Sequence, residues 1–190
     1  MSTTTRIAPL AATAVLAAGL GGCAATGLTD AALEITKAEA AATIAHLSNT
    51  EPEFAGFVAE SSGWAVFPGM MYGHSYLFGG GGGDGLVYNS SGEAVGYSRQ
   101  VRLTLGIGSF GQYNDHVVFF PDDAAMETFK GGNWEVGGEA AAGIYGLGAS
   151  GEISFSNYNV VADPRFSGGA YVAFTFDNYS YNDLAAAMGN

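Results

Sequence analysis

The apolar positions in the first part of the chain recur with a helical period. Thr29 or Asp30 can cap a helix there, and Glu34 and Lys37 then fall on its wetter side. The apolar residues at helical spacing are Leu33, Ala40, Ile44 and Leu47. A second short helix is predicted over residues 51–60, because Pro52 suits a first helical turn. Its apolar face would consist of Phe54, Phe57 and Val58.

Shorter apolar runs separated by glycine dominate the rest of the chain and predict strands. Residues 64–68 form an apolar strand that Pro68 and Gly69 should end, and residues 70–78 lead into the glycines of residues 79–83. Residues 86–88 and 94–97 flank a loop with a glycine, which predicts a hairpin. Residues 97–105 alternate between two faces. One face carries Tyr97, Arg99, Val101, Leu103 and Leu105, and the other carries Ser98, Gln100, Arg102 and Thr104.

One further helix interrupts the strands. Asp122 and Asp123 open it after Pro121, and two glycines follow Lys130. Strands are expected at residues 116–120 before this helix, and at 134–136, 143–147, 152–158, 160–161 and 169–176 after it. This order predicts an α+β fold: short N-terminal helices, then a mainly antiparallel, glycine-rich twisted sheet or barrel-like core with one intervening helix.

The N-terminal segment is typical of exported proteins. Arg6 precedes an apolar run at residues 7–20, which has the length of a signal-peptide core and is too short to span a bilayer. Cys23, the only cysteine of the chain, follows shortly after this run and is preceded by Leu-Gly-Gly. This ending resembles the lipobox of bacterial lipoproteins, which implies cleavage before Cys23 and acylation of that residue. In this resemblance Ala24, which is not Asp, implies transfer to the outer membrane. We expect the anchored domain on the periplasmic face. The alternative is an ordinary secretory peptide in which Cys23 is incidental.

The domain organisation follows from this segment. We expect a lipoprotein signal peptide at residues 1–22, a lipidated tether at 23–29 and a single domain at 30–190. Losing Arg6 leaves five basic residues against 18 acidic ones, a formal net charge of −13. Such a surface repels nucleic acid and anionic headgroups alike, so no nucleic-acid partner is expected. The 30 glycines, 12 Phe and 10 Tyr favour bent antiparallel strands with aromatic faces.

An ordered set of short motifs is similar to the SYLF domain, a family that includes yeast actin-binding proteins and bacterial lipoproteins. The motifs lie at residues 64–68, 79–88, 95–97, 108–112, 118–120 and 134–138, and the resemblance covers residues 41–179. It implies a lipid-binding domain. Eukaryotic members bind phosphoinositides and actin through a basic N-terminal amphipathic helix, whereas Lys37 is the only Lys or Arg of the two helices predicted at residues 30–60 here. Actin and phosphoinositide binding are therefore not expected.

Motifs for catalysis or cofactor binding are weak. Gly80, Gly82 and Gly85, and likewise Gly106, Gly108 and Gly111, mimic a dinucleotide fingerprint but run into predicted strands, where a phosphate site needs a helix N-terminus. Ser109 lacks the glycine two positions earlier that a nucleophile elbow needs, and Asp115 and His116 should point to opposite faces of a strand. Three scattered histidines and a single cysteine do not predict a metal site. We expect no enzyme activity and no cofactor.

Five residues are candidates for lipid contact. Arg99 shares a predicted face with apolar residues, so it would be either a buried cation paired with Glu135 or Glu139, or a partner of an anionic headgroup. Arg102, on the opposite face, would be solvated. The remaining candidates, Met70, Met71 and Tyr72, would either pack in the core or form a mobile, lipid-facing loop.

The function predicted from these features is that of a non-enzymatic outer-membrane lipoprotein. Its membrane contact would be the acylated Cys23, and its SYLF-like domain would bind lipid or another envelope protein. The alternative is a structural or self-associating protein of the cell envelope. A serine hydrolase built on Ser109 and His116 is the third hypothesis.

Overall fold

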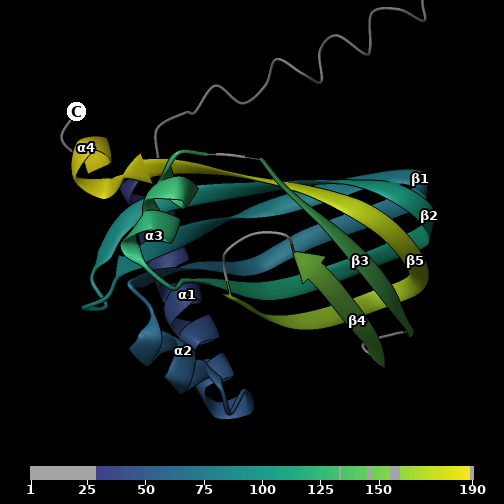
Figure 1. Ribbon diagram of the computed structural model, residues 1–190, viewed down its shortest axis with the longest axis horizontal. Helices are drawn as coiled ribbons and strands as arrows, with labels where there is room; N and C mark the ends of the chain where they lie inside the picture. The colour runs from purple at the N-terminus through teal and green to yellow at the C-terminus, as the bar shows by residue number, and fades with distance from the viewer. Residues whose placement is uncertain (1–28, 133, 145–146, 155–158, 189–190) are drawn as a thin grey trace, which may run out of the picture.

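The computed structural model describes residues 29–132, 134–144, 147–154 and 159–188 (Figure 1). Two helices come first, α1 (Asp30–Thr50) and α2 (Phe54–Glu60). They are followed by β1 (Gly63–Asn89), β2 (Ala94–Phe120), α3 (Asp123–Lys130), β3 (Trp134–Ile144), β4 (Leu147–Ser154), β5 (Asn159–Asp183) and α4 (Leu184–Met188). None of the described helices is long and apolar enough to cross a membrane.

The strands form one sheet in the order β1-β2-β5-β3-β4, and all of the pairings described are antiparallel. The expected α+β class with a mainly antiparallel sheet is thereby confirmed. The sequence left open a twisted sheet or a barrel-like core, and the described sheet is not closed, because β1 and β4 lie at the two ends of its strand order. The sheet is open and strongly curved.

The long strands β1, β2 and β5 all turn back at one end of the molecule (Figure 1). At the turn each strand has a residue with left-handed backbone: Tyr76 with φ 57°, Gly108 with φ 130° and Gly169 with φ 108°. These residues lie beside one another, since Tyr76 pairs with Gly108, and Gly169 pairs with the nearby Phe110. We call this row the fold line. It doubles the sheet into two layers, each containing one half of β1, β2 and β5.

A row of alternate glycines lets the two halves of β1 approach closely. At Gly81 an added Cβ would collide with the carbonyl oxygen of Met71 and the Cα atom of Tyr72, 2.8 Å away. Added Cβ atoms in the rest of the row would likewise meet residues of the first half of the strand. The complete row consists of Gly79, Gly81, Gly83 and Gly85. Only residues without a side chain fit in this position.

Pro68 and Gly69 do not end the first strand, contrary to the sequence prediction. They lie at a register shift between Phe67 and Met70, and Gly69 has φ 58°. A bulge of this kind accommodates proline because its missing N–H is not needed in the ladder. The glycines of residues 79–83 likewise lie within β1, so one strand runs where two strands and a break were expected.

The described helices cover the sheet at the end opposite the fold line. The N-terminus of α1 is capped by Thr29, whose Oγ1 accepts a hydrogen bond of 3.2 Å from Ala32. Together with α2 it packs on the outer face of the sheet, where Phe54 meets Phe119 edge-on. Helix α3 instead packs between the layers, where Phe129 lies 4.9 Å from the ring of Tyr179. The outer face near the fold line carries no described helix.

Candidate functional site

The interior between the layers is polar at its centre, where Arg102 belongs to a cluster of buried, hydrogen-bonded side chains. Its side chain is 1% exposed, and its Nε and Nη2 atoms donate hydrogen bonds of 2.8 Å to the two carboxylate oxygens of Asp177. Gln100 donates to the same carboxylate at 2.7 Å, and the Tyr72 hydroxyl donates to Gln100 at 3.1 Å. The guanidinium carbon lies 4.8 Å from the ring centre of Tyr72. The expectation that Arg102 is solvated was therefore wrong.

Arg99 lies on the other face, exposed to solvent. Its Nε and Nη2 atoms bind the two carboxylate oxygens of Asp84, its cross-strand partner, with the longer contact at 3.1 Å. Burial opposes ionisation of Asp84, but hydrogen bonds from Arg99 and Tyr97 lower the pKa of its carboxyl. Burial and the Asp84 carboxylate raise the pKa of Tyr97 to about 12. An ion pair was expected, but a buried one with Glu135 or Glu139, and that prediction was wrong.

Residues 70–72 lie in β1, so of the two alternatives the mobile loop is excluded, whereas packing in the core holds for Met70 and Tyr72. Met70 and Tyr72 point into the interior and are buried, whereas Met71 is 57% exposed on the outer face. Of the three apolar candidates, only Met71 is therefore available for contact with lipid in this structure.

A continuous apolar surface covers the outer face of the sheet beside the fold line. Phe78, Leu105 and Phe174 are consecutive neighbours across β1, β2 and β5, and Ile107 pairs with Val172 in the adjacent row. Ile107 is 77% exposed and Phe174 is 64% exposed. We call this the apolar end surface, made up of Met71, Tyr76, Leu77, Phe78, Leu103, Leu105, Ile107, Val172 and Phe174.

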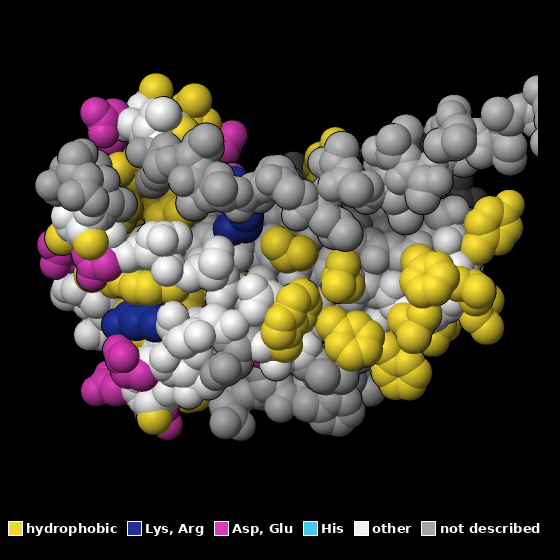
Figure 2. Space-filling model, turned by 90° about the horizontal axis from the view of Figure 1, so that it is seen from above, with side chains coloured by type: hydrophobic (Ala, Val, Ile, Leu, Met, Phe, Trp, Pro, Cys, Tyr) yellow, Lys and Arg dark blue, Asp and Glu magenta, His cyan; other side chains and the backbone are white. Residues whose placement is uncertain are grey.

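Charge is absent from the three segments that build the apolar end surface. Residues 71–83, 103–114 and 166–176 contain no Asp, Glu, Lys or Arg. Figure 2 shows hydrophobic side chains gathered over this end of the molecule and acidic side chains at the opposite end. Soluble monomers rarely expose contiguous apolar patches of more than a few hundred Å², and larger ones mark sites of interaction. The sequence signal that could have revealed the surface is the combination of these uncharged segments.

The residues considered for catalysis do not come together. Ser109 and His116 lie on one strand seven residues apart, which is about 23 Å at the usual rise per residue. Ser109 is exposed on the outer face, whereas His116 is buried in the interior. Both glycine patterns that mimic a dinucleotide fingerprint lie within strands, away from any helix N-terminus. Among the described residues, no cluster of His, Cys, Asp or Glu could hold a metal ion.

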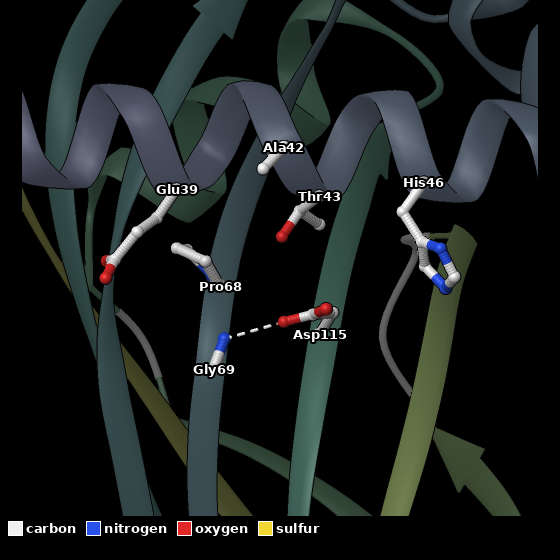
Figure 3. A pocket seen from close by; sticks show the side chains of 7 residues that line it. All are labelled: Glu39, Ala42, Thr43, His46, Pro68, Gly69 and Asp115. Carbon is white, nitrogen blue, oxygen red and sulfur yellow. Dashed lines mark hydrogen bonds between the residues drawn. The ribbon is translucent and has the colours of Figure 1, made fainter.

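A pocket of about 520 Å³ lies between α1 and the sheet (Figure 3). From α1 it is lined by Glu39, Ala42, Thr43 and His46, which share one helical face. The floor consists of the β1 bulge at Pro68 and Gly69 and of Asp115 from β2. Asp115 points toward α1 and His116 points into the interior, so the two side chains lie on opposite faces as expected.

Cys23, the predicted lipidation site, lies outside the described residues. Comparison of the chain with family models, with curated proteins and with solved structures gives no match.

Proposed function

We propose that this protein is a non-enzymatic lipoprotein of the outer membrane, anchored through acylated Cys23, whose SYLF-like domain contacts lipid. The observation that carries the proposal is the apolar end surface, an uncharged face of three strands with large exposed side chains such as Ile107 and Phe174. Burying one Leu- or Phe-sized side chain contributes about 1.5–3 kcal/mol. A few of these residues in the acyl region of a bilayer would stabilise binding without any charge attraction.

The distribution of charge indicates which bilayer this surface would bind. Without residues 1–22 the chain has five basic and 18 acidic residues, and each basic residue near an anionic membrane contributes only about 1 kcal/mol. Arg99 and Arg102 do not change this balance, since each is bound to a carboxylate. The proposed contact is therefore apolar, and zwitterionic lipid should be bound at least as well as anionic lipid.

The experiment uses a fragment from Ala24 to Asn190, which retains all of the described helices and strands. It should float with phosphatidylcholine vesicles, and Phe174→Ser should lower the vesicle-bound fraction roughly tenfold or more, the factor that loss of one buried aromatic implies. Ile107→Ser should act in the same direction. Ile35→Ser is the matched control, because Ile35 is 60% exposed on α1, away from this surface.

Two results would contradict the proposal. Equal flotation of Phe174→Ser and Ile35→Ser would exclude the apolar end surface as the contact. Capture that prefers anionic vesicles and fades with added salt would show that a local basic site governs binding, since salt screens charge attraction but leaves apolar contact intact.

The same surface also favours a second candidate function, self-association within the cell envelope. Sheet faces with exposed aromatic residues can pack on each other as well as on lipid. In that case sedimentation should show a stable oligomer that Phe174→Ser dissociates, and the fragment should not float with vesicles of any composition.

A further inference from the structure

Three consecutive apolar side chains of β1 are exposed at the fold line. Tyr76 is 81% exposed, Leu77 is 54% exposed and Phe78 is 69% exposed. Successive side chains of a regular strand point to opposite faces, so such a run would normally place at least one of them inside. Here a register shift between Tyr76 and Phe78 leaves Leu77 out of the ladder, and His74 before the shift and Gly79 after it both face the interior. The three side chains between them, which we call the tip, all face solvent.

The backbone of the tip is strained at Tyr76. Its φ of 57° lies in the left-handed region, where a bulky side chain crowds the backbone. The neighbouring strands have glycine where they cross the fold line with a left-handed backbone, at Gly108 and Gly169. Among the described residues, Tyr76 is the only one other than glycine with a positive φ. Strain of this kind is concentrated at functional sites, so the aromatic side chain points to a role other than stability.

Apolar side chains flank the tip on both layers of the doubled sheet. On the layer that contains the first half of β1, Met71 pairs with Tyr113, and the two are 57% and 50% exposed. On the other layer, Leu105 pairs with Phe174, and these are 46% and 64% exposed. Hydrophobic side chains therefore gather on both sides of the fold line at this end of the molecule (Figure 2). A flat protein face could cover one side, whereas the fluid acyl chains of a bilayer can surround both.

The chemistry of the tip fits a zwitterionic bilayer. Leu77 and Phe78 have no polar side-chain atom, which suits the acyl chains. Tyr76 has an apolar ring with a hydroxyl at its end, and Tyr is enriched at the boundary between acyl chains and headgroups. The three segments that build the apolar end surface contain no Lys or Arg that could bind an anionic headgroup.

We infer that Tyr76, Leu77 and Phe78 insert into the acyl region of a zwitterionic bilayer, with lipid in contact with both layers of the sheet around them. The inference rests on the proposed function, because it takes the apolar end surface as the lipid contact. It goes further in naming the side chains that enter the bilayer first. It also commits to insertion of the fold line, as opposed to flat contact by the outer face of one layer.

The test is quenching of tryptophan fluorescence in the natively processed protein, reconstituted with phosphatidylcholine vesicles whose acyl chains carry bromine. All variants contain Trp134→Phe, because Trp134 is 56% exposed, whereas Trp64 is only 8% exposed and can stay. The reporter Phe78→Trp should lose most of its fluorescence on contact with brominated acyl chains. Ile35→Trp is the matched control on α1, away from the fold line, and should keep its fluorescence.

Two further reporters separate the inference from the proposed function. Tyr113→Trp and Phe174→Trp, one on each layer, should both be quenched, but less than Phe78→Trp. Quenching of Phe174→Trp without quenching of Phe78→Trp or of Tyr113→Trp would show flat contact by one layer. That result would overturn the inference and leave the proposed function standing. Absence of quenching at all three positions would overturn both, and a stable oligomer in sedimentation would then assign the surface to a second copy of the chain.

Tyr76→Gly tests the role of the strained residue itself. Glycine adopts a left-handed backbone without a clash, so the urea midpoint of unfolding should rise. Quenching of Phe78→Trp in the same protein should fall severalfold, because the apolar contact of the Tyr76 ring is lost. Tyr113→Gly is the matched control for stability: its backbone is not left-handed, so glycine should lower the midpoint there. A lower midpoint in Tyr76→Gly, or undiminished quenching, would overturn the inference.

Discussion

Arg102 of β2 and Asp177 of β5 are direct cross-strand partners in the interior, joined by two hydrogen bonds of 2.8 Å. Breaking a buried ion pair by removing one of its charges costs about 3–5 kcal/mol in other proteins. Asp177→Asn should therefore lower the free energy of unfolding, measured in urea, by about that amount. Asp84→Asn breaks the exposed pair with Arg99 and should cost less than about 1 kcal/mol. Similar losses in the two variants would contradict this account of the interior.

The glycine row of β1 should tolerate no side chain. Gly81→Ala would place a Cβ against the backbone of Met71 and Tyr72, and such overpacking costs about 1–3 kcal/mol or more. Gly56→Ala is the matched control, because Gly56 lies in α2 with no atom within 4 Å of the added Cβ. In a helix this change should stabilise the protein by up to about 1 kcal/mol. Thermal unfolding of the two variants should shift in opposite directions.

His116 should make stability depend on pH. Burial, aided by the charge of Arg102, lowers the pKa of its imidazole to about 3 from the usual 6.5. Neither ring nitrogen has a hydrogen-bond partner among the described residues. The unfolded chain therefore takes up a proton near pH 6.5 that the folded protein resists, so stability is full above that pH and falls as the pH drops toward 3.

The measurement is the urea midpoint at pH 7 and pH 5. The midpoint of the wild-type protein should fall between these values, and that of His116→Leu should fall less, because Leu does not titrate. An equal fall in the two proteins would show that other groups, such as paired carboxylates, govern the acid response.

Cys23 should determine processing. The apolar run at residues 7–20 and the Leu-Gly-Gly before Cys23 predict lipoprotein maturation, which requires the thiol. Cys23→Ser should therefore leave an unprocessed precursor without acyl chains, as intact-mass spectrometry of the membrane fraction can show. A wild-type mature protein without added acyl mass would exclude the anchor.

The sequence predicted the class of fold but not which face of the sheet lies inside. The alternation over residues 97–105 was recognised, and the usual rule assigns its apolar residues to the core. The structure has the reverse: Leu103 and Leu105 face solvent, whereas Gln100 and Arg102 are buried. The reason lies far away in the sequence, because the carboxylate that makes the buried face favourable comes from Asp177 of β5.

The candidate site was also predicted only in part, because it too depends on contacts between residues far apart in the sequence. Met71 is exposed as proposed, but the larger apolar end surface depends on register, which places Phe78 and Phe174 beside Leu105. The pocket depends on Gly69 and Asp115, which are 46 residues apart. Local patterns cannot show these pairings, nor could they show that the strand continues through Pro68.

The fold line also has a consequence for how the chain reaches this structure. Tyr88 pairs with Ala94 next to the hairpin turn, whereas Gly63 pairs with Phe120 at the far ends of the same two strands. Because β1, β2 and β5 each pass through both layers, each layer holds only half of every one of these strands. Neither layer is therefore an independent folding unit. Folding should therefore start at the turn between β1 and β2. Pairing of these strands should then extend past Tyr76 and Gly108 in one cooperative event. Amide protons on both sides of the fold line should then exchange with solvent through the same global opening.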